Sequence, residues 1–189
     1  MIWGTVVFKM PSLSSNIFLV GPMGVGKSTI GRQLALIFDM NFRDSDKEIE
    51  ERTGASISLI FEIEGEAGFR KREKSIVAEL VEMSNLVLAT GGGVVLDEEN
   101  RLHLKANGHV IYLRASVDDL LIRTAHSCGR PLLKTDNPRQ RLETIFQQRE
   151  HLYQEVADAI VETGHFTVTQ VVKKVVKQIK KLEKFKKQI

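Results

Sequence analysis

The stretch GPMGVGKST, residues 21–29, decides the fold of this protein. It satisfies the pattern Gly-x-x-x-x-Gly-Lys-Ser/Thr, in which a loop turns its main-chain N–H groups inward around the phosphates of a nucleotide. The start of the following helix adds its dipole and its free N–H donors. The alternative, a glycine-rich structural turn, is disfavoured because an apolar strand pattern precedes the loop and a helical pattern follows it. We therefore predict that the chain binds a nucleoside triphosphate.

Different residues of this loop are expected to bind the phosphates of ATP and the metal ion. Lys27 is expected to reach the β- and γ-phosphates and to act in catalysis, and the Ser28 hydroxyl is expected to bind Mg²⁺. We expect one Mg²⁺ ion per protein chain, with ATP as the co-substrate. The predicted ATP-binding residues of the loop are Gly24, Val25, Gly26, Lys27, Ser28 and Thr29.

Outward from the loop, short apolar runs alternate with helical patterns. This alternation predicts an α/β protein, a three-layer sandwich in which helices cover both faces of a parallel sheet. Ligands of such sheets bind beyond the carboxyl ends of the strands. The expected strands are 16–20, 42–44, 86–89, 110–113 and 158–162, and the expected helices are 27–38, others within 46–63 and 66–83, then 98–106, 117–126, 138–153 and 168–182.

Length and composition exclude several classes of protein. The 189 residues suit a single domain spanning 1–189, with an extension over 1–15 and a basic tail over 183–189. No apolar run approaches the roughly 18 residues of a membrane span, so no membrane partner is expected. The single cysteine, Cys128, cannot form an internal disulfide, which favours a cytoplasmic location.

The basic charge is concentrated at one end of the chain. Residues 173–189 carry a local charge of +7, which leaves −4 for the rest of a chain whose net charge is +3. A nucleic-acid binder would spread its positive charge over a folded face. We therefore predict no nucleic-acid partner.

Two carboxylates follow the second expected strand, at Asp44-Ser45-Asp46. In an extended segment, residues two apart point to the same side. We expect Asp44 to face the Mg²⁺ ion through a water molecule and Asp46 to take the proton of an acceptor hydroxyl. The alternative is a solvated pair that caps the following helix.

Further motifs describe a carboxylate-binding end of the site. Arg70 and Glu73 are one helical turn apart, so the glutamate can hold the guanidinium, whose fork of donors matches a planar carboxylate. Gly91, Gly92 and Gly93 follow an apolar strand, where their main-chain N–H groups could approach a ligand that any side chain would obstruct.

With Asp44-Ser45-Asp46 and the motifs around it, the sequence resembles the shikimate kinase family. The resemblance runs from residue 16 to about 182 through Arg52-Thr53-Gly54, Gly65-Glu66, Phe69-Arg70, Thr90-Gly91-Gly92-Gly93, Arg130-Pro131-Leu132-Leu133 and Arg149…Leu152-Tyr153. It implies transfer of the ATP γ-phosphoryl group to the 3-hydroxyl of shikimate, in aromatic amino acid biosynthesis. It also implies a five-stranded parallel sheet, a P-loop NTPase fold of nucleoside monophosphate kinase type, a substrate-binding segment at 45–83 and a mobile lid at 125–138. We expect a monomer.

The resemblance also gives roles to individual residues. It implies that Arg149 is a second carboxylate clamp, that Arg123 stacks on adenine, and that Arg130 enters from the lid as a catalytic residue that also contacts ATP. The predicted substrate-binding residues are thus Asp46, Arg70, Gly91, Gly92, Gly93 and Arg149. The chain departs from the family pattern at His151, where proline is usual, and this permits a different helix end.

Three alternatives remain at this point. A kinase of another hydroxylated acid, such as gluconate, could use the same scaffold, but the two-arginine clamp argues against it. A non-catalytic regulator should have lost Lys27, Asp46 or an arginine, and all are present. An RNA-associated protein acting through its lysines would bind in a steeply salt-dependent manner.

Overall fold

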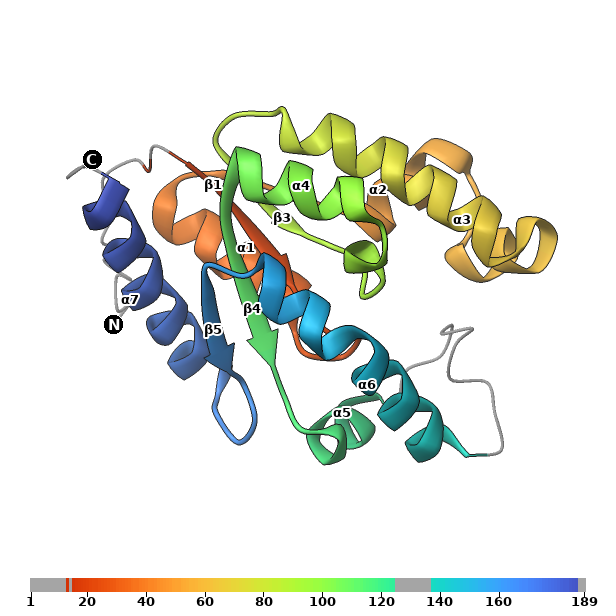
Figure 1. The fold of residues 1–189 in the computed structure, drawn as a ribbon. Coiled ribbons are helices and arrows are strands. Elements are labelled where there is room, and N and C mark those ends of the chain that lie inside the picture. The colour runs from red at the N-terminus through yellow and green to blue at the C-terminus, as the bar shows by residue number, and fades with distance from the viewer. Residues whose placement is uncertain (1–12, 14, 125–136, 187–189) are drawn as a thin grey trace, which may run out of the picture.

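The fold is a five-stranded parallel sheet with helices on both faces (Figure 1). The computed structural model describes residues 13, 15–124 and 137–186. The strand order is β2-β3-β1-β4-β5, and every pairing is parallel. In chain order the elements are β1 (Asn16–Val20), α1 (Lys27–Phe38), β2 (Asn41–Asp44), α2 (Ser45–Thr53), α3 (Ile57–Val81), β3 (Leu86–Ala89), the short 3-10 helix η1 (Val94–Leu96), α4 (Glu98–Asn107), β4 (Gly108–Arg114), α5 (Val117–Thr124), α6 (Pro138–Val156), β5 (Ala159–Glu162) and α7 (Val168–Lys186).

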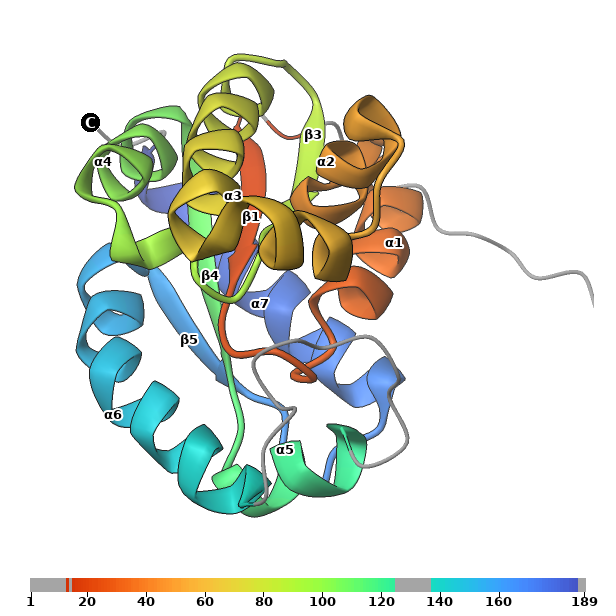
Figure 2. The ribbon, with the colours of Figure 1, turned by 90° about the vertical axis from the view of Figure 1, so that its right-hand side faces the viewer.

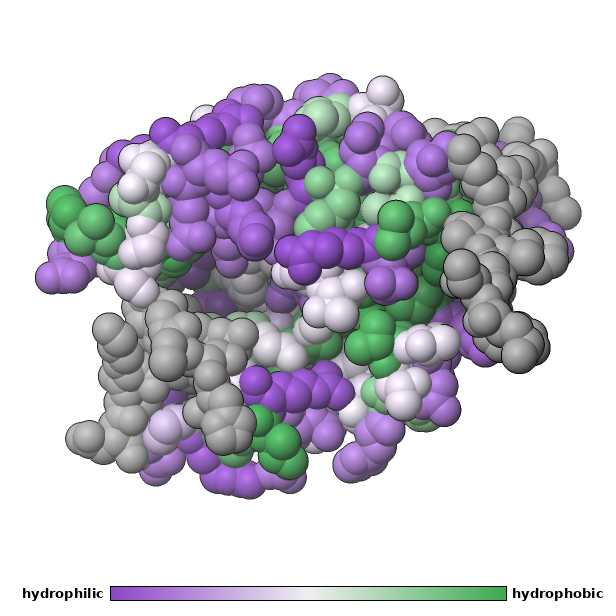
Figure 3. Space-filling view, turned by 180° about the vertical axis from the view of Figure 1, so that it is seen from behind, coloured by the Kyte–Doolittle hydropathy of each residue, from purple (hydrophilic) through white to green (hydrophobic). Residues whose placement is uncertain are grey.

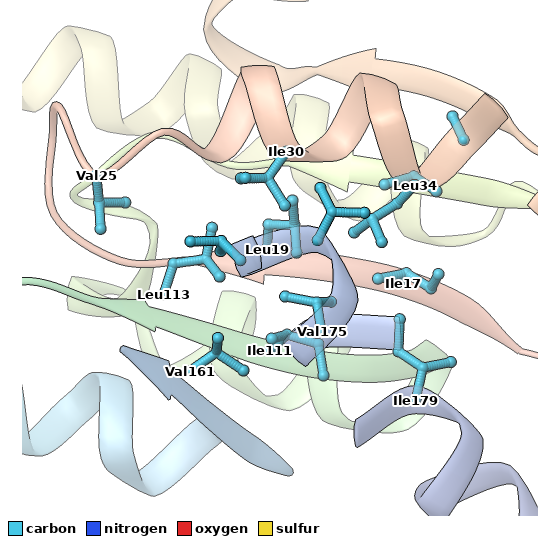
Figure 4. Close-up of a cluster of buried hydrophobic side chains, with 14 of the residues drawn as sticks. Ile17, Leu19, Val25, Ile30, Leu34, Ile111, Leu113, Val161, Val175 and Ile179 are labelled. Carbon is cyan, nitrogen blue, oxygen red and sulfur yellow. The ribbon is translucent and has the colours of Figure 1, made fainter. Parts of the chain in front are cut away.

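The sheet lies between two helical layers, as the sequence predicts. In Figure 2, α4 and α6 lie on one side of the strands and α1 and α7 on the other. Alternate residues of β1 face the two layers. Ile17 and Leu19 join the core formed with α1 and α7, which Figure 4 shows in close-up, and Phe18 and Val20 join the core formed with α3, α4 and α6. Because both faces of β1 are covered, all five of its residues are buried.

The segment between β2 and β3 differs in detail from the sequence prediction. The helices expected within 46–63 and 66–83 are α2 and a longer α3 that begins already at Ile57, where the Ser56 side chain accepts a hydrogen bond from the Leu59 N–H. Gly65 interrupts α3 with φ 70° and ψ −178°. The first turns of α3 therefore take a different direction from its remainder. The sequence prediction also missed η1, which follows the glycine triplet directly.

The terminal helix is longer than expected. It runs to Lys186, so residues 183–186 of the expected basic tail are helical. Glu183 is buried there and pairs with His109 Nε2 at 2.8 Å. The expected extension lies outside the described residues over 1–12 and at position 14, and so do most of the expected lid and Cys128. None of the helices within the described ranges is long and apolar enough to cross a membrane.

Candidate active site

A cleft of about 480 Å³ opens at the carboxyl ends of the central strands. The loop 21–26 follows β1, Asp44 ends β2, and the glycine triplet follows β3, so three strands deliver their next residues to one edge of the sheet. In the space-filling view the molecule is hollowed at the left, beneath its upper part (Figure 3). The cleft is lined by Met23, Gly24, Gly26, Lys27, Ser28, Thr29, Asp44, Asp46, Lys47, Glu50, Ile57, Phe61, Phe69, Arg70, Glu73, Thr90, Gly91, Gly92, Gly93, Arg123 and Arg149.

The loop 21–26 has the geometry of a phosphate cradle. Gly26 precedes α1 with φ 101°, a conformation that residues with a Cβ rarely adopt. Lys27 begins the helix, and its ammonium donates to the carbonyl oxygens of Gly21 at 2.7 Å and Pro22 at 2.9 Å. The charge is thereby held over the mouth of the loop, next to the free N–H groups of the helix start.

Asp44 links this loop to the second strand. Its Oδ2 accepts a hydrogen bond from Ser28 Oγ at 2.6 Å, and its Oδ1 accepts from the N–H groups of Asp46 and Lys47. It therefore caps α2 and also faces the loop, while its predicted place beside the Mg²⁺ ion stays a prediction. The expectation that Asp44 and Asp46 share one extended segment is wrong, because Asp46 already lies in the first turn of α2.

The Ser28 hydroxyl and the Asp44 carboxylate together form a suitable magnesium-binding pair. Both groups offer hard oxygen atoms beside the phosphate cradle, and Mg²⁺ usually binds one or two such groups together with substrate phosphates and water. The donor set therefore fits the ion.

Asp46 lies in the cleft within an unusual electrostatic environment. Burial raises the pKa of its carboxyl to about 7, and the negative charges of Glu73 and Asp44 act in the same direction. Lys27 and Arg70 oppose this rise. The group is thus poised to exchange a proton near neutral pH.

The Arg70 guanidinium is held by two carboxylates of its own helix. Nη1 donates to Glu73 Oε2 at 2.7 Å, and Nη2 donates to Glu66 Oε1 at 2.8 Å. Only 1% of the Glu73 side chain is exposed, against 20% for Arg70. Burial raises the pKa of Glu73, against the opposing charge of Arg70. The predicted Arg70–Glu73 pair is therefore present and aims the guanidinium into the cleft.

Side chains pack closely against two glycines of the triplet, Gly91 and Gly93. A Cβ at Gly91 would lie 2.5 Å from Glu73 Oε1 and 2.6 Å from Asp46 Oδ1, and one at Gly93 would overlap Arg70 Nη1. The Gly91 N–H donates to Ser45 Oγ at 2.9 Å. The structure therefore adds a different reason for the triplet, since the Gly91 amide serves the protein rather than a ligand.

Arg149 reaches the same glycines from α6. Its Nη1 donates to the Gly92 carbonyl at 3.0 Å, and the hydroxyl of Tyr153, one turn later, donates to the same oxygen. Arg149 is 5% exposed, and burial lowers its pKa. The helix continues through His151 to Val156, so the absence of the usual proline leaves Arg149 on a regular helix with its side chain directed into the cleft.

Within the part of the chain that the structure describes, four buried polar atoms of these side chains lack a hydrogen-bond partner, and this is the strongest indication that the cleft binds a ligand. Among the described residues, Asp46 Oδ1, Glu73 Oε1, Arg70 Nε and Arg149 Nε have no hydrogen-bond partner. Buried polar groups are normally paired, and leaving one unpaired costs about 1–3 kcal/mol. All four residues line the one cleft. Two acceptors and two cationic donors facing a phosphate cradle suit a small acid that also carries hydroxyl groups.

The structure therefore brings the predicted residues together, with two exceptions. Val25 is a core residue, 2% exposed, that does not line the cleft, although its carbonyl contacts Arg123, which does. Arg130 lies outside the described residues, so its predicted role stays a prediction. All other predicted site residues line the cleft.

Sequence reasoning gave no individual role to three residues that support the site. Ser45 holds the glycine triplet, Tyr153 holds the same triplet at Gly92, and Thr163 contacts Arg123. Ser45 lies between the two predicted carboxylates in the sequence, and this position could have marked it as a residue of the site. Tyr153 and Thr163 act over separations of 61 and 40 residues, which no local pattern encodes.

Comparison with solved structures places the fold among P-loop kinases. The shikimate kinase from Acinetobacter baumannii, solved in complex with shikimate, is similar to this chain with a TM-score of 0.87 and 46% sequence identity, over 89% of this chain and 94% of that one. A gluconokinase from Sinorhizobium meliloti is similar with a TM-score of 0.58 and 15% identity, over 92% of this chain and 95% of that one. At that identity the second likeness shows the fold alone.

Sequence comparison is more specific. The shikimate kinase of Nitrosococcus oceani is 56% identical over 168 residues, which are 89% of this chain and 88% of that protein. The family model described as shikimate kinase matches residues 23–180. With this match spanning most of the phosphate cradle, both arginines and the glycine triplet, the chain belongs to the shikimate kinase family.

Proposed function

We propose that this protein transfers the γ-phosphoryl group of ATP to the 3-hydroxyl of shikimate, which gives shikimate 3-phosphate and ADP for aromatic amino acid biosynthesis. One observation carries the proposal: Asp46, Arg70 and Arg149 share a single cleft with Lys27. The shikimate kinase relatives and the similar structure with bound shikimate support the choice of acceptor.

At the nucleotide end, the chain binds and neutralises the triphosphate. Lys27 exchanges its contacts with two loop carbonyls for contacts with the β- and γ-phosphates. Ser28 and Asp44 would hold one Mg²⁺ ion, Asp44 through water, and the bound ion would draw negative charge from the phosphate oxygens. Thr29 and the main chain of Gly24, Val25 and Gly26 complete the cradle.

At the acceptor end, the two guanidiniums fix the shikimate carboxylate. Arg70 approaches from α3 and Arg149 from α6, so the carboxylate is held from two sides. The aromatic side chains of Phe61 and Phe69, whose ring centroids are 4.7 Å apart, pack against the ring of the substrate. The acceptor is thereby oriented before the reaction begins.

Asp46 serves as the general base for the acceptor hydroxyl. The oxygen of the 3-hydroxyl forms a bond to the γ-phosphorus while the bond from that phosphorus to the β–γ bridging oxygen breaks. The hydroxyl proton passes to Asp46, and ADP leaves with the electron pair of the broken bond. Arg130, from the lid, would stabilise charge on the transferring group, as the family resemblance implies.

We further propose that the protein works as a monomer in the cytoplasm, without a nucleic-acid or membrane partner. Gel filtration at assay concentration would test the oligomeric state.

The function is tested by ADP release with Mg²⁺ and ATP, in the presence and absence of shikimate. We expect release that depends on shikimate and does not occur with gluconate at the same concentration. Release that is equal with and without shikimate, or that responds to gluconate, would overturn the proposal. A non-catalytic regulator would bind both ligands and release no ADP.

A further inference from the structure

Arg123 is held at the cleft by a set of oxygen atoms from two other segments. Its Nη1 lies 3.0 Å from Thr163 Oγ1 and 3.4 Å from the carbonyl of Val25, in the loop that cradles phosphate. Its Nη2 donates to the carbonyls of Thr163, at 3.0 Å, and Gly164. The edge of the guanidinium that carries Nη1 and Nη2 is therefore engaged by the protein, and the side chain joins α5 to the loop after β5.

Thr163 is placed to fix the direction of this edge. It is 2% exposed, and its hydroxyl lies 3.1 Å from the carbonyl of Arg114 at the end of β4. Its own N–H donates to the same carbonyl at 2.8 Å. Because a hydroxyl has a single proton, donation to Arg114 leaves a lone pair of Oγ1 directed at Arg123. The threonine is thus anchored to the sheet, and the arginine is anchored to the threonine.

A guanidinium held by its edge presents its flat faces to whatever enters the cleft. Such faces stack on planar aromatic groups, with little dependence on the hydrogen-bonding pattern of the partner. The phosphates of a nucleotide lie in the cradle next to Val25, which Arg123 itself contacts. The planar group within reach of this guanidinium is then the base of that nucleotide.

We infer that Thr163 is a positioning residue for the nucleotide base: its hydroxyl joins the end of β4 to Arg123 and so fixes the face on which the base stacks. The inference rests on the proposed function, because it assumes a nucleotide in the cradle. It assigns to the residue a role in base binding that is separate from phosphate binding by the loop 21–26.

The experiment compares two probes, ADP and inorganic tripolyphosphate, by titration calorimetry. Thr163→Val keeps the shape of the side chain and removes the hydroxyl. We expect it to weaken ADP binding about tenfold, the effect of losing one hydrogen bond to a charged group, and to change tripolyphosphate binding less than about twofold. The KM for shikimate should also change less than about twofold, and Thr163→Ser should restore ADP binding because it restores the hydroxyl.

Two further variants make the result decisive. Thr163→Ala adds no atom and must show the same selective loss, which covers the case in which valine disturbs the fold. Thr124→Val is the matched control, because Thr124 is also a buried threonine but donates to the Leu120 carbonyl within α5. Its ADP affinity should equal that of the wild type.

Equal ADP affinity in Thr163→Ala and the wild type would overturn the inference and leave the proposed function intact. Parallel loss of ADP and tripolyphosphate binding would also overturn it, since a disturbed fold affects both probes. A wild-type protein that neither binds ADP nor consumes ATP with shikimate would overturn the proposed function and the inference together.

Discussion

Asp46 is a single residue whose ionised carboxylate serves catalysis but lowers the stability of the folded protein. A carboxyl that is half-buried next to Glu73 and Asp44 is costly to ionise, and burial is the largest cause of its raised pKa. The same rise makes it a better base near pH 7 than an exposed aspartate would be. We expect catalysis and stability to respond in opposite directions when this carboxyl is removed.

Asp46→Asn should lower kcat by at least about 100-fold, because a general base contributes about 10²–10⁴ to a rate. The amide keeps the size of the side chain, so ADP affinity should stay within about twofold of the wild type. Coupled ADP release measures the first quantity and calorimetry the second. A variant with near-normal kcat would remove Asp46 from the proposed mechanism.

The same variant should be more stable than the wild type at alkaline pH when no ligand is bound. A carboxyl whose pKa rises from 3.8 to about 7 on folding stabilises the folded state below pH 4, and that contribution is lost as the pH rises through 7. The amide introduced by Asp46→Asn cannot ionise, so we expect a gain of about 1–3 kcal/mol at pH 8 that vanishes near pH 4. Thermal melts across this pH range measure it, with the exposed Asp118→Asn as control. A difference in stability between Asp46→Asn and the wild type that does not change with pH would contradict the raised pKa of Asp46.

Arg70→Ala should raise the KM for shikimate about 10–100-fold, because it deletes one fork of the carboxylate clamp. The KM for ATP should change less than about twofold, since Arg70 lies at the acceptor end of the cleft. Steady-state kinetics with each substrate varied in turn would test this. Lys71→Ala removes an exposed cation from the next position of the same helix and should alter neither KM. Equal increases in both KM values for Arg70→Ala would exclude the clamp.

At the scale of elements, the turn between β3 and η1 is shaped by side chains from other segments. Gly93 has φ −106°, which any residue can adopt, so its need for glycine comes only from the close approach of Arg70. Gly54 presents the opposite case: nothing lies within 4 Å of its missing Cβ, but φ is +65°. A substitution at Gly93 therefore tests the effect of close packing, and one at Gly54 tests the effect of backbone strain.

Gly93→Ala should therefore displace Arg70 and raise the KM for shikimate at least about fivefold, since the clamp would lose its alignment. Gly54→Ala should leave both KM values unchanged and lower the free energy of unfolding by about 1 kcal/mol, because αL disfavours a residue with a Cβ. Kinetics and urea unfolding of the two variants provide the comparison. A normal KM in Gly93→Ala would show that Arg70 does not depend on this contact.

The elements also show which features a sequence pattern can predict. The strand at Asn16–Val20 was predictable because a short run of consecutive apolar residues before a glycine-rich loop is typical of a buried strand. The direction of the Asp46 side chain relative to that of Asp44 was not, since it depends on whether the helix begins already at Ser45, where Asp44 caps α2. Tyr153 and Gly92 meet only because α6 packs beside η1, 61 residues away along the chain. Periodicity therefore predicts elements, and packing alone determines which side chains meet at the site.

In the whole molecule, the cleft and a set of stabilising polar contacts lie at opposite ends of the strands. The cleft lies at the carboxyl ends of the strands, whereas a set of long-range polar contacts joins their amino ends. The Asn16 amide donates to the carbonyl of Met83 at 2.6 Å and accepts from the Leu86 N–H at 3.0 Å. At the same edge, Glu183 of α7 pairs with His109 of β4. Neither contact involves a residue that lines the cleft.

Asn16→Ala should consequently destabilise the protein without changing its kinetics. The substitution leaves a buried N–H and at least one carbonyl unpaired, which costs about 2–3 kcal/mol, or about 4–12 °C in Tm for a chain of this length. Thermal melts measure the loss, and KM and kcat for both substrates should stay within about twofold of the wild type below the transition. Asn107→Ala, which removes a contact within α4 to the His103 carbonyl, is the matched control and should cost less than about 1 kcal/mol. A raised KM for shikimate in Asn16→Ala at full folding would show that the amino edge of the sheet transmits strain to the cleft, and would contradict the separation of the two edges.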